Sequence, residues 1–163
     1  MSKKSNRKIF KTFSDFELVL KKWKDENETI VFTNGCFDII HHGHVDSLQK
    51  SAAFGTKLIV GLNSDESVRV LKGKNRPVIG AEGRAIILAA FEFVDAVIVF
   101  EEETPAKLIA KIVPDVLVKG AQYEVHEIAG HDTVLGNGGK VEILELVDGV
   151  STSELISIIK SLD

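Results

Sequence analysis

The stretch Thr33-Asn34-Gly35-Cys36-Phe37-Asp38-Ile39-Ile40-His41-His42-Gly43-His44 decides the fold of this chain. It continues the β-branched run from Thr29 to Thr33 and leads into a helical pattern that begins near His42. A buried strand that passes through a glycine-bearing loop into a helix is the repeating unit of an α/β sheet. Ligands of such sheets bind at the carboxyl ends of the strands, so the loop from Asn34 to His44 is the first candidate for a binding site.

The same alternation of strand and helix continues along the chain. Four further short runs are apolar and rich in β-branched residues: Leu58 to Leu62, Ala96 to Phe100, Val116 to Val118 and Val141 to Leu144. Runs of this kind are typical of parallel strands that are buried on both faces. We therefore expect an α/β fold with a Rossmann-like, doubly wound sheet of five parallel strands.

The first helix precedes the sheet. Its apolar residues recur at helical spacing, at Phe16, Val19, Leu20 and Trp23. Ser14 and Glu17 form a capping-box pattern in front of it, and we expect the helix to end near Asn27.

The later helices also carry their own signals. Thr104 is expected to cap a helix over Pro105 to Ile112, with the proline at its first position. The pair Ser151 and Glu154 predicts a last helix, whose inward residues are expected to be Leu155, Ile159 and Leu162. The stretches 72–83 and 120–139 contain glycines and are predicted to be long irregular loops.

Length and charge limit the function. The chain has 163 residues, with 20 Lys and Arg against 24 Asp and Glu, a net charge of −4. We expect one domain over 1–163, with a basic segment and helix over 1–27 and a catalytic core over 28–163. An acidic chain is a poor candidate for nucleic-acid binding, which needs a basic face. The basic residues at the start are interpreted as solvated: Lys3, Lys4, Arg7, Lys8 and Lys11.

The sequence also indicates a compartment. It shows no apolar run of the length needed to span a bilayer and no hydrophobic signal segment, so we expect a cytoplasmic protein with no membrane partner. Cys36 is the only cysteine, which excludes an internal disulfide and fits a reducing compartment.

The histidines of the opening loop suggest the chemistry. His41 and His44 are three residues apart and therefore lie on one side of the first helical turn. Gly43 allows a ligand to approach the backbone, and the free N–H groups of a helix N-terminus attract anions. Two imidazoles at such a turn favour a polyphosphate. A transition-metal site and ordinary structural histidines are the alternatives that the residues alone leave open.

The pattern Gly-x-Phe-Asp-x-x-His-x-Gly-His after a strand resembles the signature of the cytidylyltransferase-like nucleotidyltransferases. Over about Ile30 to Ile159 the chain is similar to one branch, the heptose 1-phosphate adenylyltransferases that form ADP-heptose. The similar blocks are Asn63-Ser64-Asp65, Leu71-Lys72-Gly73 with Arg76-Pro77, Val94-Asp95, Phe100 to Pro105, Pro114 to Gly120, Glu127 to Gly130 and Asp148 to Thr152.

This resemblance implies transfer of AMP from ATP to heptose 1-phosphate, with release of pyrophosphate. It implies catalytic roles for four residues, His41, His44, Lys72 and Lys119. The residues implied in nucleotide binding are Asn34, Gly35, Cys36, Phe37, Asp38, Gly43, Arg84, Lys119, Gly120, Ser151 and Thr152. Those implied in binding the sugar phosphate are Asn63, Asp65, Lys72, Lys74 and Arg76.

Several of these residues have a plainer interpretation. Asp38 could orient a histidine or cap the following helix. Asn63-Ser64-Asp65 is also an ordinary helix N-cap sequence, and the capping box already explains Ser151. The cations of the stretch 72–76 could be a solvated charge run, and Arg84 could be a surface arginine.

Cofactor and partners also follow from the resemblance. Mg²⁺ is expected to arrive with ATP and to be held largely by phosphate oxygens and water, without a metal cage of protein side chains. The implied partners are ATP, heptose 1-phosphate, a second copy of the chain in a homodimer, and a separate heptose kinase. Many family members carry this domain behind a sugar-kinase domain.

The chain departs from its relatives in two places. Glycerol-phosphate cytidylyltransferases have Arg-Thr-Glu-Gly-Ile-Ser-Thr where this chain has Leu146 to Thr152, and the arginine is absent. The heptose branch usually has Lys-Gly-Gly-Asp-Tyr where this chain has Lys119 to Tyr123, with Gln122 in place of the carboxylate. The rival functions are nucleotidyl transfer to another phosphorylated acceptor and, in a different class, a non-catalytic nucleotide-binding module.

Overall fold

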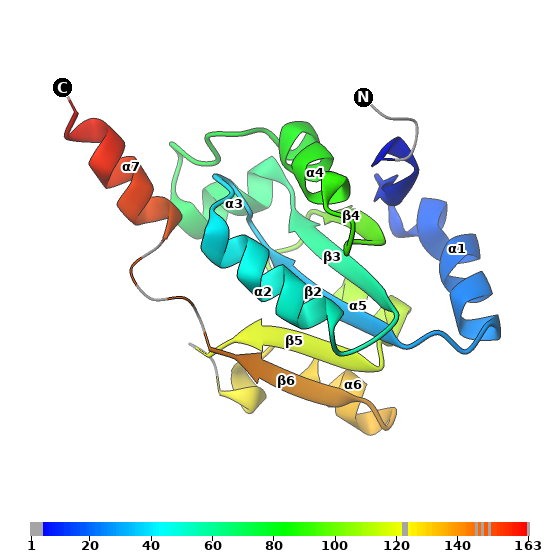
Figure 1. Ribbon diagram of the computed structural model, residues 1–163. Helices are drawn as coiled ribbons and strands as arrows, with labels where there is room; N and C mark the ends of the chain where they lie inside the picture. The colour runs from blue at the N-terminus through cyan, green and yellow to red at the C-terminus, as the bar shows by residue number, and fades with distance from the viewer. Residues whose placement is uncertain (1–4, 122–123, 146, 148, 150, 163) are drawn as a thin grey trace.

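A computed structural model describes residues 5–121, 124–145, 147, 149 and 151–162. Over these residues the chain forms a parallel sheet with the strand order β1-β4-β3-β2-β5-β6 (Figure 1). The strands are β1 (Ile9–Phe10), β2 (Ile30–Gly35), β3 (Lys57–Asn63), β4 (Ala96–Phe100), β5 (Val116–Gly120) and β6 (Lys140–Leu144). The predicted parallel α/β sheet is confirmed.

The helices are α1 (Phe13–Asp25), α2 (His42–Ala52), α3 (Asp65–Lys72), α4 (Ala81–Ala90), α5 (Ala106–Ile112), α6 (His131–Gly136) and α7 (Thr152–Lys160), with short 3₁₀ turns η1 (Ser5–Lys8) and η2 (Val125–Glu127). Residues of α1, α5 and α6 share one apolar core, and residues of α2 and α4 share the other. The side chains of strand β2 alternate between the two cores: Ile30 and Phe32 belong to the first and Val31 to the second. Side chains of successive strand residues point to opposite faces, so the sheet is covered on both sides, as a doubly wound sheet is.

The expectation of five strands was wrong by one. The sixth, β1, has only two residues and pairs Ile9 with Val97 and Phe10 with Ile98 of β4. Two apolar residues inside a basic segment are too short a run for strand periodicity to detect. The segment 5–25 is therefore part of the same sheet and core, in which Phe16 is fully buried.

Some predicted helix ends and loops were also wrong. Thr12 caps α1 in a capping box with Asp15, in place of the predicted Ser14 and Glu17, and α1 ends at Asp25. Pro105 is itself the N-cap of α5, and it makes no side-chain hydrogen bond there. The stretch 120–139 is less irregular than expected, because it contains η2 and α6.

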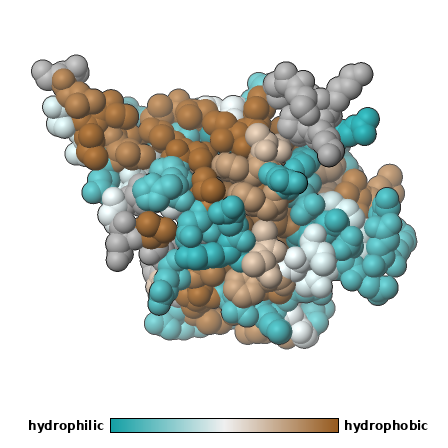
Figure 2. Space-filling view, in the orientation of Figure 1, coloured by the Kyte–Doolittle hydropathy of each residue, from teal (hydrophilic) through white to brown (hydrophobic). Residues whose placement is uncertain are grey.

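Helix α7 has an exposed apolar face. Ser151 caps it through a hydrogen bond from the Glu154 amide, as predicted. However, Ile159 and Leu162 were expected to point inward and are 57% and 78% exposed. Figure 1 shows that α7 extends away from the sheet, so its outer turns have no core to pack against. In Figure 2 the apolar surface over α7 continues across the adjoining part of the molecule.

The strand order places a crevice between two neighbouring strands. From β2 the chain moves through β3 and β4 to one side of the sheet, and then returns to β5 and β6 on the other. Strands β2 and β5 are therefore adjacent where the order reverses, and ligands of such sheets bind at the carboxyl ends of those strands. Among the described residues, no helix is long and apolar enough to cross a membrane.

Candidate active site

The turn after β2 is built tightly around Phe37. Phe37 has a φ of +46°, a left-handed conformation that costs free energy for a residue with a side chain. Its ring is buried, and a Cβ added at Gly35 would lie 3.0 Å from that ring, so a larger residue there would require the ring to shift. The ring centroid of Phe37 is also 5.3 Å from that of His44. The strained turn thus brings the end of β2 against the first turn of α2.

His41 and His44 form a close pair at the N-terminus of α2. Their ring centroids are 3.8 Å apart at an interplanar angle of 31°. His41 is the N-cap of α2 and has no side-chain capping bond, and the His44 amide donates to its carbonyl oxygen at 2.9 Å. The Nδ1 atoms of both rings are buried and have no hydrogen-bond partner among the described residues. Unpartnered buried polar atoms are rare, and here they point to a site that awaits a ligand.

Burial controls the charge of this pair. It lowers the pKa of His44 to about 4, and the neighbouring His41 adds to the shift. Burial also lowers the pKa of His41, with a smaller contribution from His42. Both imidazoles are therefore neutral at pH 7 in the ligand-free protein. An anion beside them would favour the protonated form, so they can respond to phosphate by taking up protons.

Lys119 connects the two strands at the crevice. Its Nζ lies 3.3 Å from the carbonyl oxygen of Asn34, so the end of β5 is tied to the end of β2. Burial lowers the pKa of Lys119 to about 8, and Cys36 acts weakly against that change. Lys119 therefore places a largely buried amino group at the carboxyl end of β5, next to the histidine turn, residues 34–44.

Further cations surround the same loop. Burial raises the pKa of the Cys36 thiol, while the charges of Lys72, Arg84, Arg76 and Lys119 act in the opposite direction. The cations thus come from α3, the loop after it, α4 and β5. The sequence placed these residues in separate blocks, and the fold gathers them around the end of β2.

Asp38 does not cap α2, so that interpretation was wrong. Its carboxylate is buried and accepts hydrogen bonds from the amides of Val78 and Ile79 at 2.8 to 2.9 Å and from Arg76 Nε. Burial alone would raise the pKa of Asp38, but the bonds from Ile79, Val78 and Arg76 outweigh it and hold that pKa below its usual value. Asp38 therefore fastens the loop between α3 and α4 to the histidine turn.

Arg84 is fully buried, in contrast to a surface arginine. Its Nε donates to the carbonyl oxygen of Ile79, and another guanidinium nitrogen donates to that of Cys36. The third contact is an ion pair of 2.7 Å with Asp65 at the start of α3. The guanidinium thus joins three segments of the chain, and its predicted contact with the triphosphate stays a prediction.

The other predicted cations differ in their surroundings. Lys72 ends α3, and both it and Lys74 are exposed. The Arg76 side chain is only 14% exposed and is paired with Asp38. Two exposed lysines and one largely buried arginine therefore lie between positions 72 and 76.

The side chain of Asn63 is hydrogen-bonded within the protein. Its side chain is buried and donates to Ser67 Oγ at 2.8 Å, and Ser67 in turn donates to the Glu102 carbonyl. Ser64 is the N-cap of α3, as the ordinary helix-cap interpretation anticipated. Nothing in these contacts tests a role of Asn63 in binding a sugar phosphate.

The start of α7 reaches the same site. Thr152 Oγ1 donates to the carbonyl oxygen of Ile39 at 3.3 Å, which places this helix N-terminus beside the turn after β2. Gly120 closes β5 next to Lys119, and the buried Asn34 Oδ1 at the end of β2 has no partner among the described residues. Gln122 and Leu146, at which the chain departs from relatives, lie outside the described residues, and so do Asp148 and Val150 of the block shared with the heptose branch.

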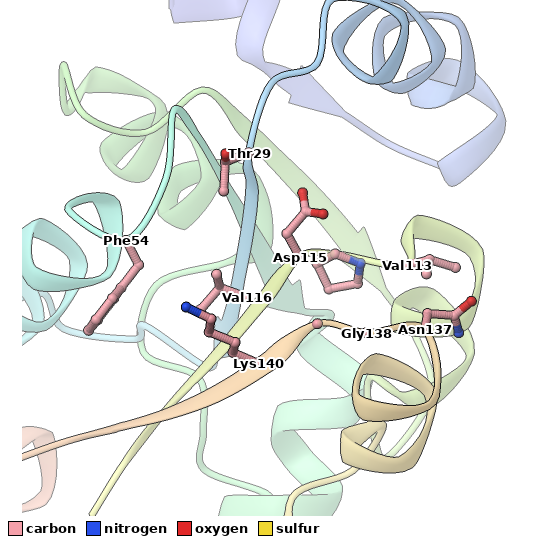
Figure 3. A pocket seen from close by; sticks show the side chains of 10 residues that line it. Thr29, Phe54, Val113, Asp115, Val116, Asn137, Gly138 and Lys140 are labelled. Carbon is pink, nitrogen blue, oxygen red and sulfur yellow. The ribbon is translucent and has the colours of Figure 1, made fainter.

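Two hollows of the surface lie away from the histidine turn. One of about 260 Å³ opens at the amino-terminal ends of β5 and β6, with Phe54, Asp115 and Lys140 in its walls (Figure 3). Another of about 480 Å³ lies between the start of α1, the end of β4 and α5. Neither of these two hollows is lined by a predicted site residue. Among the described residues, no group of three or more His, Cys, Asp or Glu side chains could hold a metal ion.

Sequence reasoning missed the backbone of Val78 and Ile79. These residues connect Asp38 to Arg84 through their amide and carbonyl groups, and apolar side chains in a loop carry no signal of that role. The proline before them marks a turn and is the only local hint.

A sheet with its switch point at β2 and β5, and a histidine pair beside a helix N-terminus, defines a nucleotidyltransferase domain. Comparison with known proteins agrees, since the profile of the cytidylyltransferase-like family matches residues 32–158. The chain belongs to the cytidylyltransferase-like family.

Similar curated proteins are considerably longer. The chain is 50% identical over 139 residues to the bifunctional protein HldE of Azorhizobium caulinodans, which covers 85% of this chain and 29% of that protein. It is 48% identical over 157 residues to HldE of Geotalea uraniireducens, covering 96% and 32%. The chain thus spans about a third of the length of these relatives.

Solved structures share the fold. A lipopolysaccharide core biosynthesis protein from Thermoplasma volcanium superposes with a TM-score of 0.60 at 25% identity, covering 74% of this chain and 97% of that one. A pantoate-beta-alanine ligase from Francisella tularensis superposes with a TM-score of 0.62 at 13% identity, covering 93% and 76%, and this likeness concerns the fold alone.

Proposed function

We propose that the chain is an adenylyltransferase that transfers AMP from ATP to heptose 1-phosphate and forms ADP-heptose and pyrophosphate. The observation that carries the proposal is the histidine pair, with its two unpartnered Nδ1 atoms, at a helix N-terminus that follows the strand end to which Lys119 is bonded. The choice of acceptor is supported by the blocks shared with the heptose branch and by similarity to the HldE proteins and to a lipopolysaccharide core biosynthesis protein.

The proposed chemistry needs position and charge, because the nucleophile is already an anion. An oxygen of the sugar phosphate attacks the α-phosphorus of ATP, a new P–O bond forms, and the bond to the β-phosphate oxygen breaks. Pyrophosphate leaves with the bonding electrons. No enzyme nucleophile or strong base is required.

The residues of the site suit these demands. His41 and His44 would donate to phosphate oxygens and take up protons as charge accumulates, since both are neutral before ATP binds. Lys119 would compensate charge from the β5 side of the crevice, and Lys72 from the α3 side. The start of α7 at Thr152 offers a further anion-binding helix end.

Mg²⁺ fits this site only as a companion of ATP. The described residues provide no cluster of metal ligands, and Asp38 is already occupied by three donors. Phosphate oxygens and water would hold the ion, which when bound neutralises phosphate charge.

The proposed assembly is a homodimer. Exposed apolar residues in and after α7 and near α3 support it, because monomeric proteins rarely expose large contiguous apolar patches. These residues are Val70, Leu71, Val78, Ile158, Ile159 and Leu162. A separate kinase would supply heptose 1-phosphate, and the reaction is proposed to take place in the cytoplasm.

Pyrophosphate release tests the proposal. Purified protein would be incubated with Mg²⁺, each anomer of heptose 1-phosphate, and ATP, CTP or GTP. We expect release with ATP and one anomer, its loss in His41→Ala, and no change in His126→Ala, an exposed histidine far along the chain. Release with CTP alone would replace adenylyl by cytidylyl transfer. ATP binding without release from any acceptor would indicate a nucleotide-binding module.

A further inference from the structure

Two loops of the site are joined by a network centred on Ile79. The first is the histidine turn, residues 34–44, and the second is the segment 73–80 between α3 and α4. The Ile79 amide donates to Asp38 Oδ1 at 2.9 Å, and the Ile79 carbonyl accepts from Arg84 Nε at 2.8 Å. This residue is therefore held from both sides by buried charged groups.

Each charged group has a further link between the two loops. Asp38 accepts from the Val78 amide at 2.8 Å and is paired with Arg76, while Arg84 donates to the Cys36 carbonyl. Asp38 is 1% exposed and Arg84 is not exposed at all. Hydrogen bonds to buried charges are stronger than neutral ones, so the segment 73–80 is fixed although five of its eight residues are exposed.

The fixed segment begins next to Lys72. Gly73, with a φ of +95°, ends α3 directly after this lysine, and the Arg76 amide donates back to the Gly73 carbonyl at 3.0 Å. Among the cations around Cys36, Lys72 makes the largest opposing contribution to the pKa of its thiol, so its charge lies near the end of β2. The segment 73–80 thus begins at the residue that directly follows this charge.

We propose that Asp38 is a positioning residue that ties the segment 73–80 to the histidine turn and thereby holds Lys72 at the phosphate site. The inference rests on the proposed function for its ligand, ATP. As a consequence, the part of the phosphate site that carries Lys72 is assembled before ATP binds. Asp38 then acts without touching the nucleotide. The conformational entropy that the segment 73–80 loses when it becomes ordered is then lost on folding and not on binding of ATP.

Binding of Mg·ATP without acceptor, followed by calorimetry, tests this role. Asp38→Asn keeps the shape but removes the charge, and we expect ATP binding to weaken about 10- to 100-fold. The matched control is Asp95→Asn, because Asp95 Oδ2 accepts from the Leu58 amide at 2.8 Å at the opposite end of the sheet. This control should bind ATP as the wild type does.

A double-mutant cycle separates positioning from general destabilisation. If Asp38 acts through Lys72, then Asp38→Asn should weaken ATP binding much less in a Lys72→Met background than in the wild type. Additive effects, or unchanged binding by Asp38→Asn, would overturn the proposal. Arg76→Met removes one donor to Asp38 and leaves both amides, and it provides a milder test if Asp38→Asn fails to fold.

Limited trypsin digestion tests, without ATP, whether Asp38 ties the segment 73–80 to the histidine turn. Asp38→Asn should be cleaved faster than Asp95→Asn after Lys72 or Lys74, because the segment is released, whereas the bond after Arg76 precedes Pro77 and resists trypsin. Equal cleavage would overturn the inference even if the wild type did not bind ATP. Failure of the wild type to bind ATP, together with faster cleavage of Asp38→Asn, would instead count against the proposed function.

Discussion

Proton uptake on ATP binding follows from the burial of His44. Its pKa of about 4 means that fewer than about 1% of ligand-free molecules carry the ring proton at pH 6.5. A phosphate beside the ring that returns the pKa to the ordinary value near 6.5 makes about half of the complexes protonated. ATP binding at pH 6.5 should therefore take up about 0.5 proton at this histidine, and almost none at pH 8.5.

Calorimetry measures this uptake directly. ATP would be titrated at each pH in buffers of different ionisation enthalpy, and the dependence of the observed heat on the buffer gives the number of protons bound. The terminal phosphate of ATP titrates in the same range, so the informative quantity is the difference between wild type and His44→Gln. His42→Gln is the matched control, since it removes an exposed histidine from the same turn.

Two results would refute the reasoning. Equal proton uptake by the wild type and His44→Gln at pH 6.5, with both binding ATP, would show that no phosphate approaches His44. Smaller proton uptake by the wild type than by His44→Gln would contradict the sign, because an anion can only favour the protonated ring.

Three further predictions concern activity and stability. The pKa of Lys119 near 8 predicts that kcat/KM falls above pH 8 as its charge is lost, and that Lys119→Arg moves this limb to higher pH; an unmoved limb would assign it to another group. Gly61→Ala should destabilise the protein by about 1–3 kcal/mol in urea unfolding, because the new Cβ would lie 2.6 Å from the buried ring of Phe32. Gly136→Ala, with open space around it, should cost much less, and equal losses would contradict the packing argument. The unfolded chain binds a proton at His44 below pH 6.5 and the folded chain only below about 4, so ligand-free stability should fall as pH falls between these values. Between pH 6.5 and 4, the free energy of unfolding of His44→Gln should therefore fall by about 1–3 kcal/mol less than that of the wild type, which thermal unfolding at each pH would measure.

Much of the fold could be predicted from local patterns. Strands such as 58–62 and 96–100 are runs of apolar residues that only a sheet covered on both faces can bury, and the order of elements then dictates parallel pairing. Patterns fail where an element is short or unpartnered. Two residues of β1 are below the length at which alternation can be detected, and an amphipathic helix such as α7 shows which side is apolar but not what covers it.

The site was predictable in its components and less so in its connections. Spacing placed His41 and His44 together because three residues nearly complete one helical turn. Asp38 and Arg84 were expected at the nucleotide, and the structure gives both of them protein partners. Besides the side chains of Arg76 and Asp65, those partners are backbone groups of Cys36, Val78 and Ile79. The positions of these backbone groups depend on the path of two loops and cannot be inferred from side-chain identity.

The short strand β1 has a consequence for solubility. Strand β4, Ala-Val-Ile-Val-Phe, has no charged or polar side chain, and without β1 it would be an open edge of the sheet. Such an edge invites pairing between molecules and growth of aggregates. Ile9 and Phe10 cover it, and Lys8 Nζ holds the cover in place through the Phe91 carbonyl at 3.0 Å. A fragment that began at β2 would keep all the histidines and lysines of the site. It would, however, expose the unpaired edge of β4, at which other molecules can pair and aggregate.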